Sequence, residues 1–120
     1  MQILAVIPAR FNSTRFPGKP LAKILGKSMI QRVYEQASKC KLLSKIIIAT
    51  ENQQIYNHVH DFGGEAIMTS STHKSGTDRC NEVVQKLTND YNIIINIQGD
   101  EPFINPNQIT ELITVFDDKK

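Results

Sequence analysis

Apolar residues along the chain follow two alternating spacings, which predict four rounds of strand and helix. Short, mostly apolar runs at Ile3–Ile7, Ile46–Ala49, Glu65–Met68 and Ile93–Ile97 are typical of strands buried in a parallel sheet. Apolar residues then recur at helical spacing after each run: Ile30, Val33, Tyr34 and Ala37; Ile55, Val59 and Phe62; Cys80, Val83, Val84 and Leu87; Ile109, Leu112, Ile113 and Phe116. Strands alternating with helices of this length predict an α/β fold with a mainly parallel sheet.

Polar and glycine residues mark the ends of these elements. Ser28 is placed to cap the first helix, with Gln31 three residues later completing a capping box. Gly63 and Gly64 end the second helix. No repeat or low-complexity segment divides the chain, so residues 1–120 are interpreted as part of one domain.

Composition narrows the class of protein. The chain has 120 residues, 40% of them hydrophobic and 22% charged, which is typical of a globular segment that needs no membrane. It lacks both a run of about 18 apolar residues and the basic start of a signal peptide, so a cytoplasmic location is expected. A formal net charge of +2 is too small to indicate nucleic-acid binding. Cys40 and Cys80 lack metal-ligand spacing and are expected to be reduced, packed thiols.

The first polar segment with unusual chemistry follows the first strand, at residues 8–20. It carries Arg10, Arg15 and Lys19, with Lys23 and Lys27 beyond them and no acidic residue between. Such a cationic loop suits phosphate oxygens, although a solvated basic surface loop is the alternative. The nearby Gly-Lys-Ser at 26–28 resembles the end of a phosphate-binding P-loop. Because Leu21 replaces the required first glycine, we interpret it as a turn and helix cap.

The second segment, residues 68–79, is rich in hydroxyl groups. The stretch from Ser75 to Asp78 is typical of a helix N-terminus, whose free N–H groups can bind a base edge or an anion. Arg79 falls in the first turn, where the helix dipole disfavours a cation. It therefore either meets a ligand or acidic partner, or is a surface residue of a capped helix.

The third segment, residues 96–103, follows the fourth strand. Asp100 and Glu101 lie just beyond Gly99, a common place to hold Mg²⁺, and Asp100 is the better candidate because it is nearer the strand end. Gln98 points to a different side from Ile97 and could offer its amide to a hydroxylated substrate. An acidic loop without a metal is the alternative. If the first and fourth strands are neighbours, this segment and the first share one crevice.

Taken together, the three segments resemble the motifs of 3-deoxy-manno-octulosonate (Kdo) cytidylyltransferase, also called CMP-Kdo synthetase. They read VIPARFNSTRFPGKPL, MTSSTHKSGTDR and NIQGDEPF, and the resemblance extends over essentially the whole chain. The first motif is shared loosely with CMP-sialate synthetases, whereas its combination with the other two is more specific. The resemblance implies a three-layer, Rossmann-like nucleotidyltransferase fold. It also implies a cytoplasmic, Mg²⁺-dependent reaction of CTP with Kdo that gives CMP-Kdo and pyrophosphate for lipopolysaccharide biosynthesis.

The same resemblance implies roles for particular residues. Arg10 and Lys19 would clamp the triphosphate, Gln98 would contact the sugar and Asp100 would bind Mg²⁺. The residues expected near the nucleotide are Ala9, Ser13, Arg15, Ser75, Gly76, Asp78 and Arg79. No covalent nucleophile is implied, because the sugar hydroxyl attacks the α-phosphate itself.

Length is the main departure from the family, whose members are about twice as long and are expected to form homodimers. The chain corresponds to the N-terminal half, so a second acidic metal ligand and much of the sugar pocket would lie outside it. The alternatives are therefore a catalytically silent CTP-binding domain, or a fragment of a CMP-sialate-type synthetase.

Overall fold

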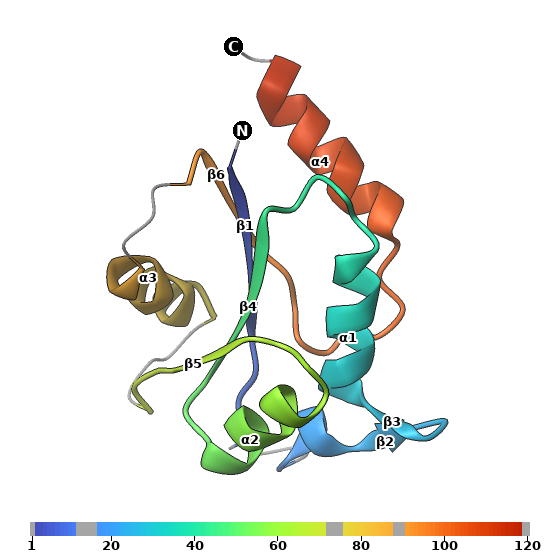
Figure 1. Cartoon of the computed structure of the whole chain (residues 1–120), viewed down its shortest axis with the longest axis vertical. Helices are drawn as coiled ribbons and strands as arrows, with labels where there is room; N and C mark the ends of the chain where they lie inside the picture. The colour runs from blue at the N-terminus through green and yellow to red at the C-terminus, as the bar shows by residue number, and fades with distance from the viewer. Residues whose placement is uncertain (1, 12–16, 72–75, 88–90, 119–120) are drawn as a thin grey trace.

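One parallel sheet forms the centre of the molecule. The computed structural model describes residues 2–11, 17–71, 76–87 and 91–118. Its main sheet has the strand order β5-β4-β1-β6, and each neighbouring pair is parallel (Figure 1). The strands are β1 (Ile3–Pro8), β4 (Lys45–Thr50), β5 (Ala66–Met68) and β6 (Ile93–Asn96). The predicted α/β class and parallel sheet are confirmed.

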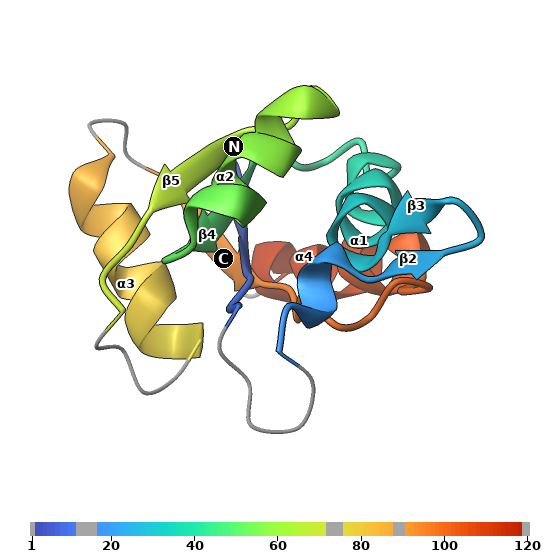
Figure 2. The same ribbon diagram turned by 90° about the horizontal axis from the view of Figure 1, so that it is seen from below.

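Helices cover both faces of this sheet, which gives three layers (Figures 1 and 2). They are α1 (Met29–Ser38), α2 (Gln53–Asp61), α3 (Gly76–Lys86) and α4 (Pro106–Asp118). Leu4 and Val6 of β1 pack with Val83 of α3 on one face. Ile3, Ala5 and Ile7 face the other side, where they join one core with α1, α2 and α4. Burial on both faces explains the unbroken apolar run of β1.

The start of α1 matches the predicted cap only in part. Ser28 is the N-cap residue, and its Oγ accepts from the Gln31 backbone N–H at 3.2 Å. The Gln31 amide does not reach back as a capping box requires; it donates to Glu35 Oε2 at 3.1 Å. Ser28 Oγ instead lies 2.6 Å from Nε2 of His58, which occupies the other side of the cap.

A small hairpin was not predicted. The short elements before α1 are a 3-10 helix η1 (Lys19–Leu21) and the antiparallel strands β2 (Lys23–Ile24) and β3 (Lys27–Ser28). Leu25 and Gly26 form the turn with positive φ values of 52° and 88°. Arg32 of α1 donates to the carbonyls of Ile24 and Leu25 at 2.6 and 2.8 Å, which holds the hairpin. Two-residue strands are too short to show an apolar period.

The two cysteines are free and buried, as predicted. Burial raises the pKa of the Cys80 thiol to about 11, against a smaller lowering effect of the adjacent Arg79 charge. A thiol held neutral in this way is a poor nucleophile, so its role is packing. Among the helices in the described part of the chain, none is long and apolar enough to cross a membrane.

Candidate functional site

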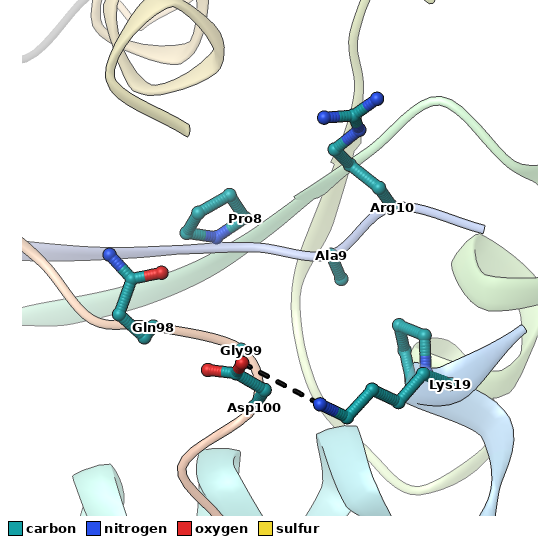
Figure 3. A pocket seen from close by; sticks show the side chains of 8 residues that line it. Pro8, Ala9, Arg10, Lys19, Gln98, Gly99 and Asp100 are labelled. Carbon is teal, nitrogen blue, oxygen red and sulfur yellow. Dashed lines mark ion pairs between the residues drawn. The ribbon is translucent and has the colours of Figure 1, made fainter. Parts of the chain in front are cut away.

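A cavity opens where the order of the strands reverses, between the carboxyl ends of β1 and β6. Ligands of open α/β sheets bind at such positions. The cavity measures about 260 Å³ and is lined by Pro8, Ala9, Arg10, Lys19, Pro20, Gln98, Gly99 and Asp100 (Figure 3). The first and third polar segments therefore meet over one crevice, as expected if their strands are neighbours.

Gly99 allows the two segments to approach closely. A Cβ atom at this position would overlap the backbone oxygen of Pro8 and lie 3.7 Å from the Ile7 side chain. Because Pro8 belongs to a central strand, it cannot move aside without disturbing the sheet. Glycine at position 99 thus brings the Gln98–Asp100 turn against the end of β1.

Lys19 and Asp100 face each other across the cavity, with Lys19 Nζ 3.6 Å from Asp100 Oδ2 (Figure 3). Their side chains are 39% and 58% exposed, so water screens the pair and its contribution to stability is small. Gly18, with φ of 72°, turns the chain so that Lys19 begins η1 at this point. Because this ion pair is exposed, either side chain can give up its partner for a ligand at little cost in free energy.

Arg10, Gln98 and Ala9 lie where the sequence placed them, at the same cavity. The Arg10 guanidinium is directed away from Lys19 and Asp100, toward the other side of β1 (Figure 3). Arg10 and Lys19 therefore lie on different sides of the end of β1 (Figure 3). Gln98 is exposed while Ile97 is 2% exposed, which confirms the predicted alternation at the end of β6.

Arg79 is buried, so its interpretation as a surface residue is wrong. Its side chain is 0% exposed, in the first turn of α3. Nη1 donates to Thr69 Oγ1 and, at 3.2 Å, to the Ser70 carbonyl. Both acceptors follow β5, so the Arg79 side chain links the start of α3 to the end of that strand. Within the part of the chain that the structure describes, Nε and Nη2 are buried without a hydrogen-bond partner.

The electrostatic surroundings of Arg79 connect it to the crevice. Desolvation is the main influence that lowers its pKa, and Arg10 lowers the pKa further. The Glu51 carboxylate is the strongest influence in the opposite direction, followed by Glu82. A buried guanidinium with two unpartnered nitrogens, which carry three N–H groups, costs stability unless a ligand completes its hydrogen bonds.

Glu51 was not predicted. It follows β4 directly, and its Oε1 accepts from the Phe11 backbone N–H at 3.0 Å. The available signal was its position: like Asp100, it is an acidic residue just beyond the carboxyl end of a parallel strand. The sequence could not show that the chain after β1 passes above it.

Among the other predicted residues, Gly76 and Asp78 are described and do not line this cavity. Ser13, Arg15 and Ser75 lie outside the described residues. Gly76 is the first residue of α3, as expected for a helix that starts in this stretch. Asp78 is exposed and borders a shallow depression on the outside of α3, with Asn81, Glu82 and Gln85.

The predicted cationic stretch is also divided between the cavity and the β2–β3 hairpin. Lys23 and Lys27 belong to the β2–β3 hairpin, and Lys27 forms an ion pair with Glu35 of α1 at 2.9 Å. Of the predicted acidic pair, Asp100 lines the cavity, whereas Glu101 lies at a separate depression between β6 and α4. The structure thus separates the two neighbouring carboxylates.

A parallel sheet covered by helices on both faces, with charged groups at the carboxyl ends of adjacent strands, defines the Rossmann-like α/β class. Within that class, the chain belongs to the cytidylyltransferase family, whose model matches residues 4–120.

Several relatives are similar in sequence to this chain over nearly its whole length. It is 54% identical over 118 residues to the 3-deoxy-manno-octulosonate cytidylyltransferase of Parabacteroides distasonis, covering 98% of this chain and 46% of that protein. The enzyme of the same name from Chlamydia pneumoniae is 56% identical over 110 residues, covering 92% and 43%. The chain therefore spans about half the length of the curated relatives it matches.

Solved structures give the same result for the fold. A CMP:2-keto-3-deoxy-manno-octonic acid synthetase complexed with CTP matches with a TM-score of 0.94 and 45% identity, over 98% of this chain and 48% of that one. A cytidylyltransferase from Leptospira borgpetersenii matches with a TM-score of 0.76 over 96% of this chain and 48% of that one, at 20% identity. At that identity the likeness concerns the fold alone.

Proposed function

We propose that the chain is the CTP-binding half of a cytidylyltransferase that transfers CMP to the anomeric hydroxyl of Kdo, releasing pyrophosphate. The observation that carries this proposal is the crevice between β1 and β6, in which Lys19 and Asp100 face each other 3.6 Å apart. Relatives named for this reaction are 54% and 56% identical to the chain over 98% and 92% of its length. The product would serve lipopolysaccharide biosynthesis in the cytoplasm.

The reaction places no demand for a nucleophile on the protein. The sugar hydroxyl attacks the α-phosphate and loses its proton to solvent, the bond to the β-phosphate breaks, and pyrophosphate leaves with the negative charge. Lys19 and Arg10, from different sides of the end of β1, would neutralise the charge that develops on the phosphate oxygens. Catalysis would then depend on positioning and charge rather than on a covalent intermediate.

Asp100 fits the coordination chemistry of Mg²⁺. Mg²⁺ usually takes one or two carboxylates and completes its coordination with water and phosphate oxygens. Asp100 offers a half-exposed carboxylate at the cavity, and no group of three or more potential metal ligands occurs among the residues the structure describes. The residues therefore suit a metal shared with phosphate. When bound there, Mg²⁺ would add positive charge beside the triphosphate.

Gln98 and Arg79 would serve recognition. Gln98 is exposed beside Asp100, where its amide can both donate to and accept from a hydroxylated sugar. Two donor nitrogens of Arg79, Nε and Nη2, have no partner among the described residues, and a nucleotide oxygen that reached them would complete their hydrogen bonds. Ser13, Arg15, Ser75, Gly76 and Asp78 remain candidates for the nucleotide site from the sequence motifs.

Two measurements on the chain test the proposal. We expect calorimetry to detect CTP binding in the presence of Mg²⁺, and pyrophosphate release when CTP and Kdo are added together with a polypeptide matching the other half of the relatives. CTP binding without release under those conditions would favour a silent CTP-binding domain. Release with an acidic nine-carbon sugar in place of Kdo would favour a CMP-sialate-type enzyme, and absence of CTP binding would contradict the proposal.

The first prediction concerns Asp100→Asn. The amide keeps the size of the side chain and removes its charge, so Mg²⁺ should no longer strengthen CTP binding, whereas the half-exposed position should leave stability unchanged within about 0.5 kcal/mol. Titrating CTP with and without Mg²⁺ measures the effect. Glu101→Gln is the matched control, because Glu101 lies outside the cavity. Equal Mg²⁺ dependence in Asp100→Asn and the unaltered chain would refute the assignment.

A further inference from the structure

We propose that Glu51 is a positioning residue that fixes the cations of the crevice without touching the substrate. The inference rests on the proposed function, since those cations are the ones assigned to CTP. Glu51 lies at the carboxyl end of β4, one strand away from the cavity between β1 and β6. Its influence reaches the cavity through three contacts, each made by a described residue.

The first contact replaces a backbone hydrogen bond. β1 and β4 pair in parallel, and Ala9 N–H donates to the Ala49 carbonyl at 2.8 Å. In a parallel ladder the next donor, Phe11 N–H, would pair two residues further along, at position 51. Its acceptor is instead the Glu51 side chain, at 3.0 Å. The carboxylate thus satisfies this donor while the chain leaves the sheet, and it fixes the residue that follows Arg10.

The second contact passes this constraint to Lys19. The Phe11 carbonyl accepts from Gly18 N–H at 2.8 Å, and the Phe11 ring packs where a Cβ of Gly18 would lie 3.1 Å away. Gly18 directly precedes Lys19, which faces Asp100. One residue, Phe11, therefore joins the Glu51 carboxylate at its N–H to the position of Lys19 at its carbonyl.

The third contact is electrostatic. Glu51 is the strongest charge that favours the cationic form of Arg79, whose side chain is 0% exposed. Arg10 acts in the opposite direction. Glu51 thus favours the charge of Arg79, which Arg10 disfavours, and offsets the repulsion between these two cations.

The turn that contains Glu51 does not itself need this carboxylate. Asn52 is the N-cap of α2, with its Oδ1 accepting from Ile55 N–H at 3.1 Å. Thr50 Oγ1 accepts from the Asn52 N–H at 3.2 Å. Since neighbouring residues provide the caps, the charge of Glu51 serves the segments packed above it.

Binding of CTP and of CMP to the chain, measured by calorimetry with Mg²⁺, tests the inference. Lys19 and Arg10 are assigned to the triphosphate, so Glu51→Ala should lower the affinity for CTP by about tenfold, a change of about 1.4 kcal/mol, and that for CMP by much less. Glu51→Gln keeps an acceptor for Phe11 N–H and should restore most of the preference for CTP over CMP. A merely destabilising substitution would weaken both ligands alike and leave that preference unchanged.

Glu65→Ala is the control. Glu65 is a half-exposed carboxylate paired with Lys45 at 3.2 Å, beside the start of β5 and so at the opposite edge of the sheet. The Glu65→Ala chain should bind both nucleotides as the unaltered chain does. If Glu51→Ala does not fold, Glu51→Asp carries the test, because its shorter side chain withdraws the carboxylate from Phe11 while keeping the charge.

The outcomes separate the two proposals. An unaltered chain that binds neither nucleotide removes the proposed function and this inference with it. An unaltered chain that prefers CTP, together with folded Glu51 variants of unchanged preference, overturns the inference alone. Loss of preference in Glu51→Ala or Glu51→Asp, with recovery in Glu51→Gln, supports it.

Discussion

Lys19 and Arg79 are both cations near the carboxyl ends of the strands, but their surroundings are opposite. The Lys19 side chain is 39% exposed and faces Asp100, with which it forms an ion pair. Arg79 is fully buried, and among the described residues only Nη1 of its guanidinium finds hydrogen-bond partners. The exposed cation contributes little to stability, and the buried one opposes it.

This difference separates two ways of preparing a cation for an anionic ligand. Lys19 is free to exchange its carboxylate partner for a phosphate oxygen, because water already screens the pair. If Arg79 binds the nucleotide as proposed, it would be held in place before the ligand arrives, and its donors would lose little on binding because their hydration is already lost. Burial would then make Arg79 a preorganised donor, at a cost in folding stability.

The largest expected effect concerns the crevice in which the exposed Lys19 lies. Gly99→Ala would place a Cβ into the Pro8 backbone oxygen and force β1 and the β6 turn apart. We expect the free energy of unfolding to fall by about 2–3 kcal/mol, as for overpacked cores, with loss of CTP binding. Urea denaturation and calorimetry measure the two effects.

Gly26→Asn is the matched control for this substitution. A Cβ at Gly26 meets nothing within 4 Å, and asparagine tolerates its positive φ of 88°. It should change stability by less than about 0.5 kcal/mol. Equal losses at both positions would contradict the close approach inferred at Gly99.

The next prediction concerns the buried cation, Arg79. Arg79→Met keeps much of the apolar volume and removes the desolvated charge, so we expect stability to be unchanged or higher. CTP affinity should fall by about tenfold or more, since hydrogen bonds to charged groups contribute about 1.5–3 kcal/mol. Denaturation and nucleotide titration on the same variant test this opposition. A large loss of stability with unchanged affinity would assign Arg79 to the fold instead.

The smallest expected effect concerns the exposed cation itself, Lys19. Lys19→Ala should weaken CTP binding by about fivefold to tenfold, a change near 1 kcal/mol, because it removes one screened charge from the crevice. Stability should be unaffected. Lys27→Ala is the control, since Lys27 forms a similarly exposed pair with Glu35 outside the cavity. Equal weakening by both variants would show a general effect of charge.

Much of the fold was predictable because its signals are local. The apolar runs marked every strand of the main sheet, and Ser28 marked the start of α1. Asp100 and Lys19 could be assigned to one crevice, because both follow strands whose carboxyl ends meet. The β2–β3 hairpin was missed, since Arg32 and a turn hold it in place of an apolar pattern.

The sequence by itself determined the parallel α/β fold, the edge where the crevice forms and the residues Lys19, Gln98 and Asp100 that line it. These depend on apolar periodicity and on position relative to a strand end. Only the tertiary structure decided that Arg79 is buried, that Gly99 touches Pro8 and that Glu51 holds Phe11. The physical reason is that each of these contacts joins separate segments, so it exists only once the strands have taken their order in the sheet.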